Sequence, residues 1–258
     1  MSLPTEPEIA PIPSEMLPED KRFNKLPHHE ILFKPPFTAV AIGAIGSGKT
    51  SFCYSLVDKH YKNYFDEVVV ISGTIDSKES WENVSQKTVI FLDFFDENSF
   101  KEYITTLEHD QEERKKKGKF PIRVLLVLDD IIFDGYNKNR VGVLEKLFYT
   151  CRHYFISILL CLQHSKQISA GIRNQIFYWN LFRLTQNDLM KMSEEHSNSL
   201  TPEEFRDMHT SIMKKGRHEW LQINYKNPFE KRFLHRFTTV VGNKLIKGDR
   251  EKENSDSE

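Results

Sequence analysis

The stretch Gly43-Ala44-Ile45-Gly46-Ser47-Gly48-Lys49-Thr50 follows the pattern G-x-x-x-x-G-K-[ST]. In this pattern the glycines let the backbone wrap so that consecutive N–H groups point at one phosphate, and the helix that follows adds its positive N-terminal end. Lys49 would reach the β- and γ-phosphates, and the hydroxyl of Thr50 would bind Mg²⁺. We therefore predict that this loop, with the next residue Ser51, holds ATP and magnesium.

The segments on either side provide the setting that such a loop requires. An apolar run, residues 38–42, ends directly before it, and a stretch with helical spacing carries Phe52, Leu56 and Val57 after it. A glycine-rich turn that merely contained Lys-Thr would not need this strand-loop-helix order. The context therefore favours a phosphate-binding loop.

Short β-branched runs alternate with longer amphipathic stretches along the chain, which is the pattern of βαβ units around a mostly parallel sheet. Such strands are covered by helices on both faces. The predicted fold class is α/β, that of a P-loop NTPase. We expect strands over residues 38–42, 67–72, 88–92, 124–128, 155–162, 175–184 and 219–224. We expect helices after Gly48, over residues 97–117, 141–152 and 187–196, and from Pro202, where Thr201 and Glu204 form a capping box.

The two ends of the chain differ from its middle in composition. Residues 1–30 hold six prolines among acidic residues, which predicts a flexible arm. Residues 242–258 have no apolar periodicity, which predicts a disordered charged tail. The ATPase domain with a C-terminal extension would then span residues 31–241.

Charge and cysteine content limit the protein's class. With a net charge of −1, any contact with nucleic acid must come from a local basic surface. Cys53, Cys151 and Cys161 lack the spacing of a zinc site or a disulfide framework, so we expect buried thiols of a reducing compartment. No apolar run approaches the ~20 residues that cross a bilayer, and no signal-like segment begins the chain. We expect a soluble intracellular protein.

A second acidic element lies further along the chain, where the apolar run 124–128 ends in Asp129 and Asp130. Asp129 would hold magnesium, usually through water. Asp130, one step further out, would orient or deprotonate the water that attacks the γ-phosphate. Taken alone, this string is better explained as a strand that runs into a polar turn. Its pairing with the phosphate loop favours the functional interpretation.

GTP is a poor match to this sequence. Guanine recognition needs the motif Asn/Thr-Lys-x-Asp, and the closest string is Asn137-Lys138-Asn139-Arg140. The arginine cannot accept the hydrogen bonds that guanine donates. The nucleotide expected is therefore ATP.

Three polar residues beyond the acidic element are further candidates. Gln163 ends the expected strand 155–162, where it would sense the γ-phosphate or orient water. Arg173 is the first candidate for an arginine finger that reaches the neighbouring subunit's γ-phosphate in a ring, and Arg152 is the second. The alternatives are a loop hydrogen bond for Gln163 and a surface salt bridge for either arginine.

In this order, the elements resemble the DNA-packaging ATPases of poxviruses, other large nucleocytoplasmic DNA viruses and virophages, of the FtsK-HerA superfamily. The resemblance covers roughly residues 37–184 and rests on the phosphate loop, Leu128-Asp129-Asp130, Arg152-His153, Gln163 and Ile172-Arg173-Asn174. Many relatives in the wider superfamily have Asp-Glu where this chain has Asp129-Asp130.

The resemblance implies a RecA/FtsK-HerA-like motor that hydrolyses ATP to ADP and phosphate while it moves double-stranded viral DNA into capsids. It also implies a homo-oligomeric ring, capsid or portal-region proteins as partners, and a location in the host cell cytoplasm or viral factory, or with the virion. The basic clusters at residues 114–119 and 214–218 are candidate contacts to DNA phosphates, with a solvated turn as the alternative for each.

Two other functions remain open at this point. One is a small-molecule or nucleotide kinase, in which residues 114–119 would form a lid over a phosphate acceptor. The other is a nucleotide-gated assembly protein, in which ATP binding merely orders a contact.

Overall fold

The computed structural model describes residues 20–72, 81, 83–92, 96–130, 138–198 and 200–241. The predicted tail at 242–258 lies outside this range, as do residues 1–19 of the predicted arm. The rest of that arm packs against the domain: Phe23 is buried, and Arg123 donates hydrogen bonds of 3.0 and 2.8 Å to the carboxylate of Asp20. This part of the arm is therefore attached to the sheet.

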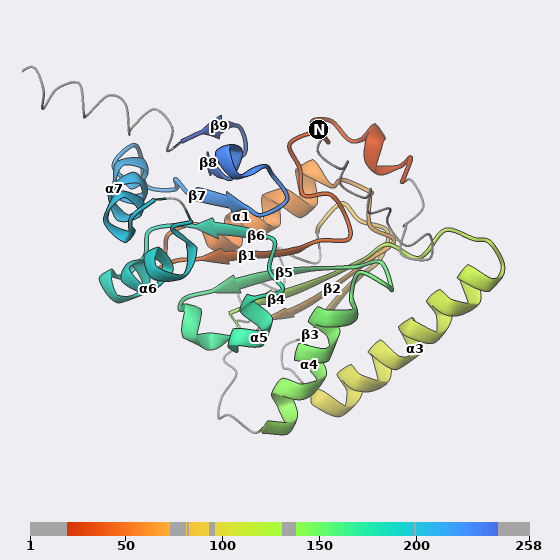
Figure 1. Ribbon diagram of the computed structural model, residues 1–258. Helices are drawn as coiled ribbons and strands as arrows, with labels where there is room; N and C mark the ends of the chain where they lie inside the picture. Colours follow the sequence, from red (N-terminus) through yellow and green to blue (C-terminus); the bar gives the residue numbers. More distant parts are fainter. Residues whose placement is uncertain are drawn as a thin grey trace, which may run out of the picture.

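A single sheet forms the centre of the described chain, with its strands in the order β3-β2-β4-β5-β1-β6-β7-β8-β9 (Figure 1). The strands from β3 to β6 in this order run parallel, and β7, β8 and β9 continue the sheet in antiparallel fashion. The prediction of a mostly parallel sheet is confirmed. The strands are β1 (Thr38–Ile42), β2 (Glu67–Ser72), β3 (Val89–Leu92), β4 (Val124–Asp129), β5 (Ile156–Leu162), β6 (Tyr178–Leu181), β7 (Leu221–Asn224), β8 (Phe233–His235) and β9 (Thr239–Val240).

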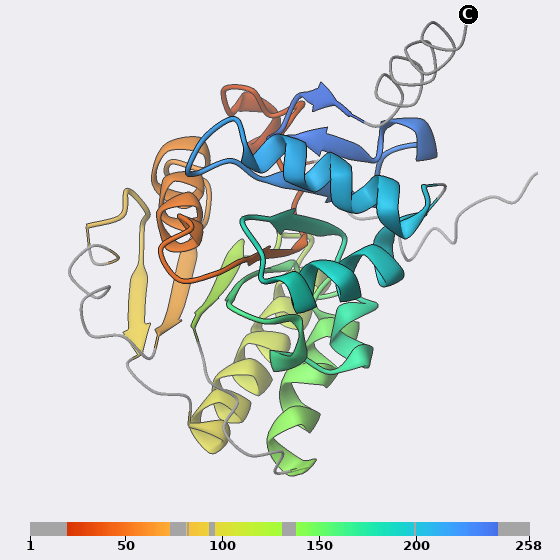
Figure 2. The same ribbon diagram turned by 90° about the vertical axis from the view of Figure 1, so that its left-hand side faces the viewer.

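Helices cover both faces of the sheet, as predicted. Figure 2 shows α1 on one side and α3 to α7 on the other. The helices are α1 (Lys49–Ser55), which continues into the π-helical turn η3 (Leu56–His60), α3 (Glu97–Lys116), α4 (Lys138–Thr150), α5 (Ala170–Arg173), α6 (Gln186–His196) and α7 (Pro202–Met213). Short 3-10 turns lie at η2 (Phe23–Lys25), η5 (Ser165–Gln167) and η6 (Phe229–Lys231).

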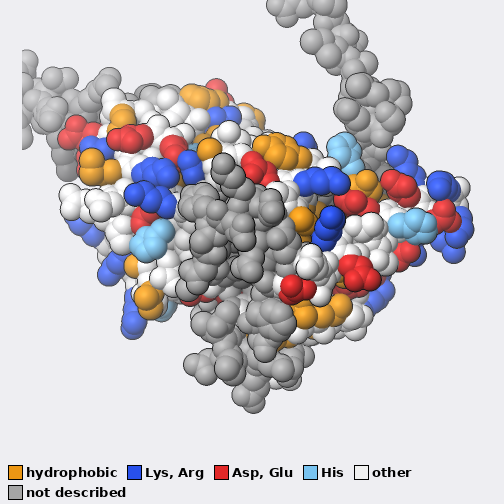
Figure 3. Space-filling model, turned by 90° about the horizontal axis from the view of Figure 1, so that it is seen from below, with side chains coloured by type: hydrophobic (Ala, Val, Ile, Leu, Met, Phe, Trp, Pro, Cys, Tyr) orange, Lys and Arg blue, Asp and Glu red, His pale blue; other side chains and the backbone are white. Residues whose placement is uncertain are grey.

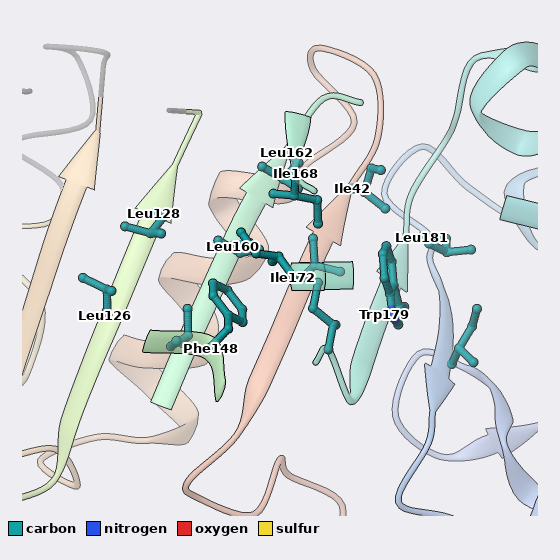
Figure 4. Packing of buried hydrophobic residues seen from close by; sticks show 14 of the residues in the cluster. Ile42, Leu126, Leu128, Phe148, Leu160, Leu162, Ile168, Ile172, Trp179 and Leu181 are labelled. Atoms are coloured by element: carbon teal, nitrogen blue, oxygen red, sulfur yellow. The ribbon is translucent and has the colours of Figure 1, made fainter. Parts of the chain in front are cut away.

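The central strand β1 shows why these strands are apolar throughout. All five of its residues are buried, and they face the two cores alternately. Val40 and Ile42 belong to the core under α3 to α7, whereas Ala39 and Ala41 belong to the core under α1. Figure 4 shows the first core, where Phe148 and Ile172 lie against the strands. Burying each large apolar side chain stabilises the fold by about 1.5–3 kcal/mol.

The structure differs from the sequence predictions at element ends. The expected strand 175–184 is only Tyr178–Leu181, because a turn that follows α5 occupies the residues before it. Strands β8 and β9 are short and were not predicted. The capping box is confirmed, since Thr201 and Glu204 exchange backbone-to-side-chain bonds of 2.7 and 3.1 Å. Among the described residues, no helix combines the length and apolarity needed to span a bilayer.

Candidate active site

The phosphate loop joins β1 to α1 at the carboxyl ends of the parallel strands. The Gly43 N–H donates to a carbonyl at the end of β5 (3.1 Å), and the Ala44 N–H donates to the carbonyl of Arg183, just after β6 (2.8 Å). Gly46 and Gly48 have φ angles of 72° and 102°, in the left-handed region that glycine adopts without strain. Both neighbours of β1 therefore hold the loop in place.

Two glycines of the loop have close neighbours that leave no room for a side chain. A Cβ on Gly43 would lie 2.7 Å from the Cβ of Phe182, and a Cβ on Gly48 would lie 2.8 Å from Nδ1 of His218. His218 is also 3.2 Å from the carbonyl oxygen of Ser47. The loop is thus packed between β6 and the segment that leads into β7.

Lys49, the first residue of α1, is 8% exposed. Its ammonium donates a 3.0 Å hydrogen bond to the carbonyl of Ala44, so the charge lies over the loop's own backbone. A phosphate oxygen is a stronger acceptor for an ammonium group than a neutral carbonyl. The side chain is therefore placed to exchange this bond for one to a nucleotide phosphate.

Thr50 and Asp129 form a pair of oxygen donors beside the loop. The Thr50 hydroxyl donates to Oδ1 of Asp129 (3.2 Å), and Asp129 is 1% exposed. Its other oxygen, Oδ2, is buried and has no hydrogen-bond partner among the described residues. Burial raises the pKa of Asp129, and the nearby charge of Asp130 adds to this effect. An unpartnered carboxylate oxygen next to a hydroxyl suits Mg²⁺, so these residues fit the predicted metal.

Asp130 and Gln163 are joined by hydrogen bonds across the ends of β4 and β5. The Gln163 side-chain amide donates to both carboxylate oxygens of Asp130, at 2.9 and 2.7 Å. Asp130 has a φ of 52°, a conformation that aspartate tolerates better than most residues, and its N–H donates to the carbonyl of Cys161 (3.1 Å). The Gln163 N–H in turn donates to the side chain of Gln167 (2.8 Å). These two predicted residues therefore lie together near the loop.

The two predicted arginines lie away from the chain's own loop. Arg173 is 17% exposed, lies 3.3 Å from Glu195 of α6 through Nε and donates to the carbonyl of Ile168 (2.9 Å). Arg152 is exposed, with its guanidinium 5.5 Å from the centre of the Phe177 ring. It precedes β5, whereas the loop lies past the other end of that strand, roughly 20 Å away at 3.3 Å per residue. Neither arginine reaches this chain's own phosphates from these positions.

The basic cluster at residues 114–119 does not cover the loop. It comprises the last turn of α3 and the turn that leads to β4, so it lies at the amino ends of the strands, whereas the loop lies at their carboxyl ends (Figure 1). Lys116 and Lys117 both pair with Glu113, at 3.2 and 3.3 Å. Figure 3 shows basic and acidic side chains mixed on the side of the molecule where α3 lies. The predicted kinase lid therefore has no support from this arrangement.

Two residues near the loop were not predicted as part of the site. His218 was grouped with the basic cluster 214–218, but the antiparallel pairing of β7 with β6 brings it to the loop. Arg183 fell inside an expected strand, yet it lies just past β6 with an exposed side chain. Both residues could have been assigned to the site only by knowing that β6 lies directly beside β1. That order of strands is not readable from one sequence.

All three cysteines are free and buried, as predicted. Cys161 lies under the site, with Sγ 3.8 Å from the Thr50 hydroxyl.

Several solved structures share the fold. The genome packaging NTPase B204 from Sulfolobus turreted icosahedral virus 2, in complex with AMP, superposes with a TM-score of 0.57 at 13% identity, over 81% of this chain and 100% of that chain. The pCW3 conjugation coupling protein TcpA, with ATPγS, superposes with a TM-score of 0.55 at 14% identity, over 92% of this chain and 75% of that chain. ATPases 2 and 3 of EssC from Geobacillus thermodenitrificans superpose with a TM-score of 0.53 at 10% identity, over 85% of this chain and 43% of that chain.

These likenesses confirm the P-loop NTPase fold class. No curated protein matches the sequence. The family described as poxvirus A32 protein matches residues 21–223, which is most of the chain. This match confirms the resemblance to packaging ATPases of the poxvirus type that the order of motifs predicted. The chain belongs to the poxvirus A32 protein family.

Proposed function

We propose that the protein is an ATP-driven motor that moves double-stranded viral DNA into capsids. The observation that carries this proposal is the convergence of two pairs, Thr50–Asp129 and Asp130–Gln163, at one phosphate loop. The first pair fits a metal and the second fits an attacking water, so the site has the parts of a hydrolase. The family match and the fold shared with a genome packaging NTPase support DNA packaging as the work that hydrolysis drives.

The loop's N–H groups and Lys49 bind the phosphates of ATP and orient the γ-phosphate toward the ends of β4 and β5. Thr50 and Asp129 would hold Mg²⁺, whose positive charge would offset the negative charge of the β- and γ-phosphates. Because burial has already raised the free energy of the Asp129 carboxylate, a cation at this position relieves an unfavourable charge.

Asp130 accepts a proton from the attacking water as its oxygen bonds to the γ-phosphorus. The bond between the γ-phosphorus and the β–γ bridging oxygen breaks, ADP leaves, and the proton passes from Asp130 to the released phosphate. The two hydrogen bonds from Gln163 fix the direction of the carboxylate during this step. Gln163 directly follows β5, which ends at Leu162, so a shift of that strand moves Gln163 and changes the orientation of the Asp130 carboxylate.

A homo-oligomeric ring accounts for the position of the arginines. A finger that acts in the neighbouring subunit's site must lie away from its own loop, and Arg152 meets this requirement with an exposed side chain. Arg173 would have to leave Glu195 before it could act. We therefore favour Arg152 as the finger and retain Arg173 as the second candidate. Capsid or portal-region proteins would dock the ring, in the host cytoplasm, the viral factory or the virion.

The test measures ATP turnover by the full chain with and without double-stranded DNA, alongside the mass of the oligomer. The proposal expects an oligomer whose turnover rises with duplex DNA, and Lys49→Ala should abolish hydrolysis with or without it. A monomer that duplex DNA does not stimulate would contradict the proposal. Phosphate transfer to a small acceptor would instead support a kinase, and full biological activity of Asp130→Ala would support a nucleotide-gated assembly protein.

A further inference from the structure

A cavity of about 320 Å³ lies beside the phosphate loop, against the outer side of α1. Gly48 and Ser51 are among its lining residues, and both belong to the segment that would hold the nucleotide's phosphates. Ser55, one turn further along α1, lines the cavity beyond them. The cavity therefore adjoins the segment that would hold a triphosphate chain.

Four large aromatic side chains line the cavity. Phe52 of α1, Phe182 after β6, Trp220 before β7 and Phe237 after β8 all line it. These rings also contact one another: Phe182 stacks on Trp220 with centroids 5.6 Å apart, and Phe52 stacks on Phe237 at 6.0 Å. Flat apolar walls of this kind suit a planar heterocycle, because each face of such a ring can stack on an aromatic neighbour.

The lining also contains polar groups that suit the edge of a heteroaromatic ring. Ser55 and His60 add a hydroxyl and an imidazole to the lining. The cavity thus combines stacking surfaces with donors and acceptors, as nucleoside sites do.

Three residues of the lining come from the C-terminal part of the chain. His218 and Trp220 lie in the segment that enters β7, and Phe237 lies between β8 and β9. His218 is also the residue that touches the Ser47 carbonyl and blocks any Cβ on Gly48. The strands that follow the parallel sheet therefore form the second side of the space that α1 and the loop begin.

We propose that this cavity binds the adenine base and ribose of ATP, with the C-terminal strands closing it over α1. The inference rests on the proposed function, since it takes the triphosphate to be held at the loop. It gives the C-terminal extension a direct role in nucleotide binding.

The test compares two probes on the full chain in the presence of Mg²⁺: ADP, which has a base, and inorganic triphosphate, which has none. Ser55→Leu fills the cavity without removing an apolar contact, and should raise the dissociation constant of ADP roughly tenfold or more by excluding the base. The dissociation constant of triphosphate should stay within about twofold of the wild-type value, which also shows that the variant is folded. Thr106→Leu, an equivalent change at an exposed position of α3, is the matched control and should alter neither.

Phe237→Ala is the second variant, because it removes one wall from the partly exposed side of the cavity. It should also weaken ADP binding and leave triphosphate binding unchanged, and it decides the question if Ser55→Leu does not fold. A folded variant of either kind that binds ADP as tightly as the wild type overturns the inference. If the wild-type chain binds neither probe, the proposed function fails, and the inference falls with it.

Discussion

The side-chain amide of Gln163 spans both carboxylate oxygens of Asp130, at 2.9 and 2.7 Å. The contact joins the ends of two neighbouring strands, β4 and β5, at the point where they meet the phosphate loop. Because the carboxylate can turn only by breaking these bonds, its orientation depends on Gln163.

The first prediction concerns this pair. Asp130→Ala should lower kcat by about 10²–10⁴-fold, as expected for loss of a general base. Gln163→Ala should lower it by roughly ten- to a hundredfold, since the base remains but is no longer oriented. In the double variant the Gln163 change should add almost nothing, because it acts through Asp130. Single-turnover hydrolysis measures all three rates, and independent, multiplying effects would show that Gln163 acts on the γ-phosphate directly.

The second prediction concerns the buried acid. Because burial raises the pKa of Asp129, its ionised form destabilises the folded state at neutral pH. Asp129→Asn should therefore raise the melting temperature of the nucleotide-free protein at pH 7 while abolishing hydrolysis. The gain should shrink as the pH falls through the raised pKa toward the ordinary value of 3.8, where the wild-type acid becomes neutral too. Asp110→Asn, at an exposed position of α3, should show no such gain.

Removing the metal gives the third prediction. Chelation of Mg²⁺ should stop hydrolysis, whereas ADP should still bind through the loop and Lys49. Thr50→Val, which removes the hydroxyl but keeps the shape of the side chain, should raise the Mg²⁺ concentration needed for half-maximal turnover. Titrating Mg²⁺ at saturating ATP measures this, and an unchanged titration curve would rule out Thr50 as a ligand.

The fourth prediction separates the two arginines. Arg173→Ala and Glu195→Gln should each lower stability by about 1–2 kcal/mol, because each breaks a partly buried ion pair. Arg152→Ala should change stability by less than about 1 kcal/mol, the contribution of an exposed cation on an aromatic ring. It should lower turnover about a thousandfold if it is the finger.

Mixed oligomers of wild-type and Arg152→Ala subunits complete that test. A finger slows only the site of the neighbouring subunit, so turnover should fall in proportion to the variant subunits without any loss of stability. Loss of turnover in Arg173→Ala at full stability would instead make Arg173 the finger.

The elements nearest the loop were the most predictable from the sequence. β1 has the predicted bounds, since an apolar run before a glycine pattern permits few alternatives. β2, which lies three strands away from β1, also has the predicted bounds. The pairing of Asp130 with Gln163 was predictable only as two separate candidates, because it depends on β4 and β5 being neighbours. The aromatic cavity was not predictable: Phe52, Phe182 and Trp220 are far apart in sequence and meet only because β7 turns back along β6.

The central place of β1 also affects how the chain folds during its synthesis. β1 is the first strand of the described chain, but Thr38 pairs with Ile158 on one side and Ala39 pairs with Tyr178 on the other. A ribosome that has made the first half of the chain has therefore released the phosphate loop without either neighbouring strand. Contacts this distant in sequence form slowly, and an apolar strand that waits for them is prone to aggregate. The nucleotide site is thus one of the last parts of the nascent protein to form.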